Sequence, residues 1–465
     1  MPFIFYDTET TGTETSYDQI LQFAAISTDD NLEAQDEINR RCRRLPHVVP
    51  SPGALLATGI SLDTLERESV SHYHMVREIR DWLWQKSPTV FLGYNSVRFD
   101  ETLLRQALYQ TLHPVYLTNT EGNCRGDVML LAQAAAVYAP QSIAVPQGDR
   151  GRFVFQLGPL ARENGILFGE EEAHEALADV RATLDLARFI RSNAPEIWEV
   201  MLNNTRKATV KAFVEENMLF CLTNFFFGFP YSYVVTLAGE NIENDSEIAV
   251  FDLAQDPQDF VDLSVDELLS VLKKSPKVIR TVRTNAQPII MPYPMMPAEI
   301  RGPRHDDATY HEWAQVIREN EDFQNRLGQA LARRYEDVEP SPYVEGKIYD
   351  GFASSGDQGR MEQFHDAPWS ERYALCDQLE DERFAELGRR LIYLEEPDAL
   401  PDADRTRFDR WVADRMLTEE DVPWTTIRKA LQEIDDLRRQ SPEDVARLEE
   451  IRDFLLALAD SHAPS

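Results

Sequence analysis

The sequence has few cysteines and no long apolar run. Its 465 residues include four cysteines, which lie far apart with no CxxC pair and no histidines at metal-binding spacing. This scatter excludes a disulfide framework and a Cys/His zinc site, and it is typical of reduced thiols in a cytosolic protein. No stretch of about 18 apolar residues that could cross a membrane occurs, and the N-terminus shows no secretion signal. We therefore expect a soluble cytoplasmic protein.

Positive charge is also scarce. The chain has 47 Lys and Arg against 80 Asp and Glu, a formal net charge of −33. Proteins that bind nucleic acid usually carry a basic surface, so the total argues against that function. It does not exclude a local basic groove, because many of the acids lie in the last hundred residues, where a solvated helical surface explains them. The most basic short run, residues 40–44, fits either a solvated edge strand or a phosphate contact.

The chain is too long for one core, and roughly 100 to 200 residues per domain predicts two to four domains. Apolar runs alternate with helical patterns over the first 200 residues or so, which indicates an α/β domain. Short strands follow from about residue 205, and helical spacing follows a linker at 338–342. Strands are expected from residue 3 and at 19–27, 33–45, 89–95, 231–237, 247–253 and 277–284. Helices are expected at 71–86, from 101, and at 128–138, 155–166, 384–394, 408–416, 427–437 and 445–458.

Two carboxylates follow the first apolar run. Asp7 and Glu9 are one residue apart, and side chains alternate along a strand, so both lie on the same face. An isolated Asp-x-Glu is more often a solvated strand end. Here the preceding run is apolar enough to be buried on both faces, and ligands collect at the carboxyl ends of such strands. A buried acid pair needs a counter-charge, and a divalent cation supplies one.

Three further polar residues stand at the ends of predicted elements. Asp100 follows the strand at 89–95 and precedes a helix, so taken alone it is more readily an N-cap than a ligand. His174 and Asp179 are five residues apart, which on one helix separates them by about 140°. We therefore place His174 before the helix or in its first turn and Asp179 inside it. In isolation this stretch fits a surface histidine and a solvated aspartate equally well.

Together these five residues resemble the active site of the DEDDh exonucleases, which have an RNase H-like fold. The resemblance rests on Asp-Thr-Glu-Thr-Thr-Gly at 7–12, Gly-Tyr-Asn-Ser-Val-Arg-Phe-Asp at 93–100 and His-x4-Asp at 174–179. Stretches at 45–60 and 164–174 are more specifically similar to the bacterial exonuclease I family. Weaker similarity, including Tyr-Asp-Gly-Phe at 349–352, extends it over essentially the whole chain.

The resemblance implies a site with two Mg²⁺ ions, for which Mn²⁺ substitutes. Asp7 would bridge both ions, Glu9 and Asp179 would complete one site, and Asp100 would support the other through water. His174 would act as general base, since an imidazole titrates near neutral pH. The implied substrate contacts are Thr8, Glu9, Thr10, Arg105, Tyr116 and Gln156. Glutamine stands at 156 where the family would have an arginine, so this contact brings no charge.

The implied architecture has three parts: an exonuclease domain at 1–200, an SH3-like β-barrel domain with helical insertions at 201–340, and an all-α domain at 345–465 that closes over the cleft. Four phenylalanines of the second part, at 225, 226, 227 and 229, could stack on bases, although core packing suits most of them better. Candidate contacts to the nucleic-acid backbone are Arg206, Lys207, Lys211, Lys273, Lys274, Lys277, Arg280 and Arg283.

The sequence thus predicts a single-strand-specific 3′ to 5′ exodeoxyribonuclease that releases 5′-mononucleotides in DNA repair and recombination. The implied partners are single-stranded DNA and the C-terminal tail of single-stranded-DNA-binding protein, with the enzyme itself a monomer. One alternative is a 3′ to 5′ exoribonuclease, because the active-site residues are common to both. Another is a non-catalytic single-strand-binding scaffold, which would have no chemical need for all five residues.

Overall fold

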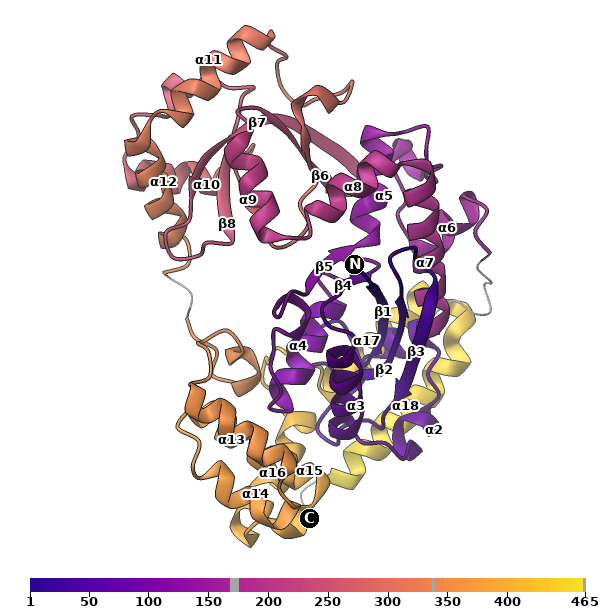
Figure 1. Ribbon diagram of the computed structural model, residues 1–465. Helices are drawn as coiled ribbons and strands as arrows, with labels where there is room; N and C mark the ends of the chain where they lie inside the picture. Colours follow the sequence, from indigo (N-terminus) through magenta and orange to yellow (C-terminus); the bar gives the residue numbers. More distant parts are fainter. Residues whose placement is uncertain (168–174, 337–338, 463–465) are drawn as a thin grey trace.

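The computed structural model describes residues 1–167, 175–336 and 339–462 (Figure 1). Its N-terminal region is built on a five-stranded mixed sheet with strand order β3-β2-β1-β4-β5. β1 lies in the middle, antiparallel to β2 and parallel to β4. The strands are β1 (Phe3–Thr10), β2 (Ile20–Thr28), β3 (Ala34–Arg41), β4 (Val90–Gly93) and β5 (Cys124–Asp127).

Helices cover both faces of this sheet, which is why β1 is apolar on both sides. Phe3 and Phe5 pack against α5 (Val128–Tyr138) and α7 (Ala176–Asn193) on one face. Ile4 and Tyr6 pack against α3 (His72–Gln85) and α4 (Asp100–Gln110) on the other. Each fully buried side chain of this size contributes about 1.5–3 kcal/mol. The α/β prediction for this region is confirmed. Its remaining helices are α1 (Pro52–Thr58), α2 (Leu62–Arg67), α6 (Leu157–Glu163) and α8 (Pro195–Asn203).

A second five-stranded sheet, wholly antiparallel, has the order β10-β6-β7-β8-β9. Within the described residues no ladder joins β9 to β10, and the expected SH3-like barrel stays a prediction. The elements are β6 (Phe220–Phe226), β7 (Phe229–Glu240), β8 (Glu247–Asp252), β9 (Ile279–Arg283), β10 (Ile290–Pro292), α9 (Lys207–Glu216), α10 (Val265–Lys273), α11 (Asp307–Arg318) and α12 (Glu321–Arg333).

The hairpin of β6 and β7 begins earlier than the sequence analysis expected, since its first predicted strand here starts at residue 231. The preceding run is mostly apolar, with Thr223 and Asn224 in its middle, and lacks the alternation that marks a half-buried strand. The structure pairs this run, Phe220–Phe226, with the next strand. The Tyr138 and Thr223 hydroxyls, 2.7 Å apart, join the second sheet to α5.

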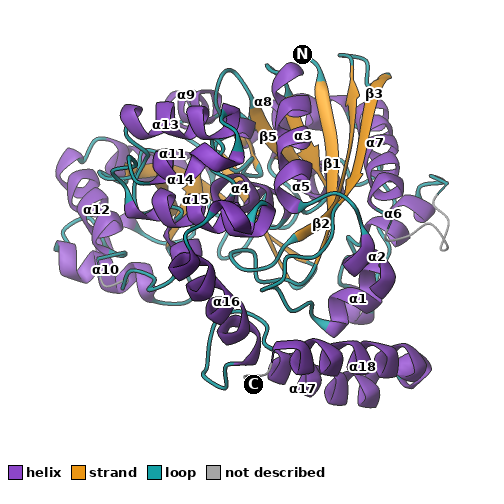
Figure 2. Ribbon diagram, turned by 90° about the horizontal axis from the view of Figure 1, so that it is seen from below, coloured by secondary structure: helices purple, strands orange, loops and turns teal. Residues whose placement is uncertain are grey.

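The C-terminal region is helical and wraps around the first sheet's helices. α17 and α18 pack side by side and both contact α1 (Figure 2). Leu55 and Leu65 lie in one apolar cluster with Ile434 and Leu448. The Glu433 carboxylate accepts hydrogen bonds from the Ser51 hydroxyl and the Gly53 amide. The helices are α13 (Ser355–Asp366), α14 (Trp369–Cys376), α15 (Glu382–Glu395), α16 (Asp402–Leu417), α17 (Ile427–Gln440) and α18 (Val445–His462).

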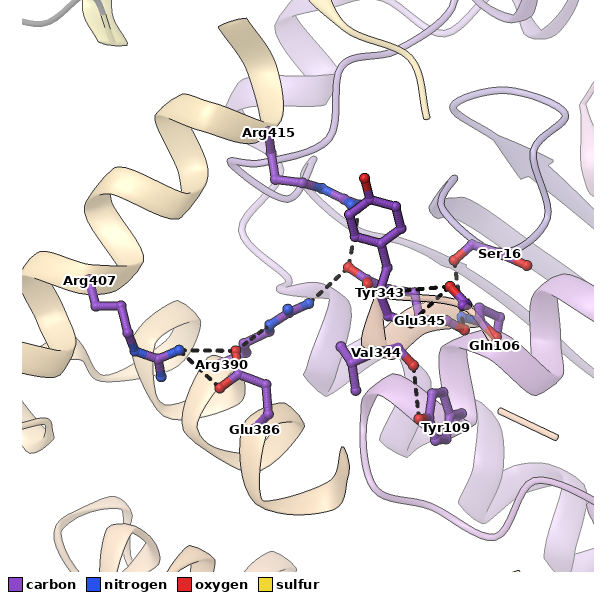
Figure 3. A network of polar contacts seen from close by, with 11 residues as sticks. Ser16, Gln106, Tyr109, Tyr343, Val344, Glu345, Glu386, Arg390, Arg407 and Arg415 are labelled. Atoms are coloured by element: carbon purple, nitrogen blue, oxygen red, sulfur yellow. Dashed lines mark hydrogen bonds and ion pairs between the residues drawn. The ribbon is translucent and has the colours of Figure 1, made fainter. Parts of the chain in front are cut away.

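A buried acid fixes the segment that leads into these helices (Figure 3). Glu345 is 2% exposed and pairs with Arg390 at 2.8 Å and Arg415 at 3.3 Å. Burial alone would raise the pKa of Glu345, but the two arginines outweigh it and hold the pKa below its usual value. Its backbone carbonyl accepts from the Gln106 amide, and the carbonyl of Val344 accepts from the Tyr109 hydroxyl. The C-terminal helices are thereby tied to α4.

All four cysteines are buried and free. Of the helices that the structure describes, none combines the length and the apolar character that crossing a membrane requires.

Candidate active site

Three of the five predicted residues meet at one point. Asp7 and Glu9 project from the same face of β1, and Asp179 reaches them from the first turn of α7, which packs across β1 and β2. Each residue offers a carboxylate oxygen, and the three oxygens lie within 4.8 Å of one another. Strand alternation put the first two together, as predicted, and the packing of α7 adds the third.

This carboxylate cluster (Asp7, Glu9 and Asp179) is electrostatically unfavourable as it stands. Burial raises the pKa of Asp7 well above its usual value, and the charges of Asp100, Glu9 and Asp179 raise it further. Burial and then Asp179 and Asp100 raise the pKa of Glu9 to about 9, against a small opposing effect of Arg41. Acids packed this closely either keep protons or gain a cation. Hard carboxylate oxygens fit a divalent ion such as Mg²⁺ or Mn²⁺.

Asp100 lies beside the cluster and is held by Thr8. The same carboxylate oxygen of Asp100 accepts from the Thr8 amide at 3.1 Å and the Thr8 hydroxyl at 2.6 Å. Burial raises the pKa of Asp100 to about 7, although the Thr8 hydrogen bond lowers it. The N-cap interpretation of Asp100 is wrong: α4 begins at Asp100, its N-cap is Phe99, and no side chain caps it. The Asp100 carboxylate bonds instead to Thr8 on β1, which is far away in the sequence.

His174 lies outside the described residues, so its predicted role stays a prediction. Its neighbour Glu175 was missed by the sequence analysis. Glu175 is the N-cap of α7 and accepts from the Ala178 amide at 3.2 Å. Its other oxygen accepts from Gln22 at 2.9 Å and Asn39 at 3.1 Å, on β2 and β3. The helix start that presents Asp179 is thus anchored to the sheet. No clear signal in the sequence pointed to this cap, because Ser, Thr, Asp and Asn are the preferred N-cap residues and glutamate is not among them.

Of the predicted substrate contacts, the two threonines use their hydroxyls in bonds within the protein, and Arg105 and Tyr116 contact each other. Thr10 is buried, and its hydroxyl donates to the Gly12 carbonyl, as Thr8 donates to Asp100. Arg105 is 8% exposed, pairs with Glu101 at 2.7 Å and lies over the Tyr116 ring at 5.0 Å.

Gln156 lies beside a large cavity. It is exposed at the start of α6 and makes no side-chain capping bond. It shares with Asp179 a cavity of about 830 Å³ that α5, α6, α7 and the β6–β7 hairpin line. The residues lining this cavity are Tyr94, Asn95, Met129, Gln133, Phe153, Phe155, Gln156, Leu157, Gly158, Pro159, Arg162, Asp179, Phe225 and Gly228.

The basic run at 40–44 spans the end of the edge strand β3 and the residues after it. Arg40 pairs with Glu78 at 2.6 Å, and Arg44 pairs with Glu66 at 3.0 Å. Arg41 lies 3.7 Å from Glu175, and Arg43 donates to the Ser69 carbonyl. Of the two alternatives, these contacts favour the edge strand over a phosphate site.

The sheet order and the carboxylates on β1 and α7 define a nuclease with an RNase H-like exonuclease domain. Residues 4–187 match the family model described as exonuclease. Residues 342–458 match the model of the exonuclease I C-terminal domain. The chain is a nuclease, a hydrolase, and its two ends match the exonuclease model and the model of the exonuclease I C-terminal domain.

Relatives cover most of the chain. It is 28% identical over 383 residues to exodeoxyribonuclease I of Escherichia coli, covering 77% of this chain and 78% of that protein. The structure of E. coli exonuclease I in complex with a dA16 oligonucleotide matches with a TM-score of 0.85 and 23% identity, over 99% of this chain and 100% of that one. A structure of SSB/exonuclease I in complex with the inhibitor CFAM matches with a TM-score of 0.83 and 23% identity, over 99% of both chains. At this identity the two structures establish the fold.

Proposed function

We propose that this protein is a single-strand-specific 3′ to 5′ exodeoxyribonuclease that releases 5′-mononucleotides. The observation that carries the proposal is the carboxylate cluster, three acids within 4.8 Å at the edge of a cavity. Both family models and a curated relative that acts on DNA by its name support the substrate class. A role in DNA repair and recombination, in the cytoplasm, follows from the same kinship.

The donor set fits a two-metal site. Asp7, Glu9 and Asp179 would hold one Mg²⁺ or Mn²⁺ ion, and Asp100 would support a second. Bound divalent ions neutralise the non-bridging oxygens and stabilise the departing oxygen in phosphodiester hydrolysis.

The chain's own residues orient these acids and move the proton. Thr8 fixes the Asp100 carboxylate by two hydrogen bonds, and Glu175 anchors the start of the helix that carries Asp179. His174 takes the proton of the attacking water as general base; this role rests on the sequence motif. Arg105, Tyr116 and Gln156 are proposed to contact the substrate strand.

The other two regions are proposed to select and hold a single strand. Residues 201–340 form a domain of SH3-like type, and residues 345–465 form a helical domain that closes over the cleft. The ties of Glu345 and Glu433 to the nuclease region support this closure. The enzyme acts as a monomer and binds the C-terminal tail of single-stranded-DNA-binding protein, by analogy with the SSB/exonuclease I structure.

The test is a time course on 5′-labelled single-stranded DNA, matched RNA and blunt duplex, with Mg²⁺ or with EDTA. Metal-dependent shortening from the 3′ end of single-stranded DNA alone is the expected result. Preference for RNA would make the protein an exoribonuclease. Binding without cleavage under Mg²⁺ or Mn²⁺ would make it a scaffold.

A further inference from the structure

The turn between β6 and β7 holds an aromatic side chain where the backbone disfavours one. Phe227 and Gly228 are its two central residues, with φ of 52° and 80°. Positive φ at both positions is the type I′ pattern, which prefers Asn-Gly or Asp-Gly. A bulky residue in the left-handed region is a rare and strained choice. Phe227 is also 93% exposed. Backbone strain of this kind collects at ligand clamps.

The turn is anchored at the cavity that contains Asp179. Gly228 and Phe225 line that cavity. The Gly228 carbonyl accepts from the Phe153 amide at 2.9 Å, and a Cβ at position 228 would meet the Phe153 carbonyl oxygen at 2.4 Å. The Phe155 and Phe225 rings form an edge contact at 5.2 Å. The exposed ring of Phe227 is therefore carried by a fixed turn at the border of the cavity.

Three arginines border the same place. Arg150 and Arg152 are exposed in the loop that holds the turn, and Arg162 lines the cavity. Within the part of the chain that the structure describes, none of the three forms an ion pair, although acids outnumber bases by 80 to 47. An exposed aromatic ring beside exposed arginines is the arrangement that grips single strands, since every base has a face to stack on.

We propose that Phe227 stacks on a base of the single-stranded nucleic acid whose 3′ end lies at the carboxylate cluster, and that Arg150 and Arg152 contact the flanking phosphates. This inference rests on the proposed function and extends it upstream of the scissile bond. Gln156 is uncharged, so the positive charge along the bound strand comes from Arg150 and Arg152. Stacking tolerates any base, so the contact adds affinity without sequence preference.

The experiment uses the full chain in EDTA and oligonucleotides with the fluorescent base 2-aminopurine at successive positions from the 3′ end. The wild type quenches the fluorescence within one window of positions. Phe227→Ala loses the quench there and binds about tenfold more weakly. Phe227→Trp retains both. Ile242→Ala is the matched control, because Ile242 is 65% exposed beyond the opposite end of β7. It leaves the quench and the affinity unchanged.

A second variant separates stacking from structure. Phe227→Asn relieves the left-handed strain, so its Tm rises while its affinity falls; a merely structural role would move both together. On an oligonucleotide of abasic nucleotides, Phe227→Ala binds like the wild type. Equal loss on abasic and normal strands would overturn the proposal, as would an unchanged quench. A 3′ digestion assay in Mg²⁺ runs in parallel. Wild-type quench without digestion would overturn the proposed function alone, and digestion with an unaltered Phe227→Ala quench would overturn this inference alone.

Discussion

Two buried acidic sites of this molecule are built in opposite ways. At Glu345 the protein supplies two arginines for one carboxylate, and the pKa of Glu345 falls. At the carboxylate cluster it places acids side by side, and the pKa values of Asp7 and Glu9 rise. At the first site the protein itself supplies the positive charge, and the ion pairs hold two regions together. At the second site the acids raise one another's pKa, which suits a site that binds a cation.

The largest expected effect is the loss of hydrolysis in Asp179→Asn. Removing one ligand of the cluster should reduce kcat by at least about 10³-fold, while relief of like-charge repulsion leaves the Tm of the metal-free protein undiminished. Asp185→Asn is the control: Asp185 lies on the same helix and pairs with Arg188 at the surface. It should stay within about twofold of the wild type. Full activity of Asp179→Asn would contradict the metal assignment.

At the opposite site, Glu345→Gln should act on stability. It takes the carboxylate partner from the buried Arg415 and one of two from Arg390, which costs about 3–5 kcal/mol of unfolding free energy. Glu386→Gln removes a more exposed partner of Arg390 and should cost about 0–1 kcal/mol. Urea unfolding of both variants measures the difference. If the two costs were equal, the Glu345 site would not be the structural junction that its burial implies.

The raised pKa values of Glu9 and Asp100 predict how much a divalent ion stabilises the protein at each pH. The pKa of Glu9 is about 9 and that of Asp100 about 7 in the folded protein, against about 4 for unfolded carboxyls. Between those values the metal-free folded state binds more protons than the unfolded state, so its stability falls as pH rises. Divalent ions replace those protons. The rise in Tm on adding Mg²⁺ or Mn²⁺ should therefore be larger at pH 9 than at pH 6, measured against EDTA. A rise in Tm that is the same at pH 6 and pH 9 would contradict this prediction.

The smallest effect is expected at Thr8. Thr8→Val removes the hydroxyl that holds Asp100 at 2.6 Å and should lower kcat by about tenfold. Thr8→Ser keeps the hydroxyl and should restore most of the activity. Steady-state hydrolysis of single-stranded DNA gives both values, and a loss in Thr8→Ser with none in Thr8→Val would point to packing of the methyl group instead.

Local signals in the sequence predicted what depends on neighbours in the chain. The helix at 128–138 was found with its bounds, because Asp127 caps an apolar run, and the Asp7–Glu9 pair followed from strand alternation. Local patterns could not predict the Thr8–Asp100 bonds or the arginine partners of Glu345, because these contacts join residues far apart in sequence. The apolar run at 220–226 became a strand only through its pairing with β7.

The docking of α17 and α18 on α1 has a consequence for synthesis of the protein. Leu55 and Leu65 share one apolar cluster with Ile434 and Leu448. The apolar surface around α1 and α2 is therefore covered by helices that follow it by nearly four hundred residues in the sequence. N-terminal regions generally fold first as a chain leaves the ribosome. During translation the nuclease region therefore carries an uncovered apolar patch until the last helices emerge. A nascent chain stalled before α17 presents that patch to chaperones, and a truncated product presents it to proteases.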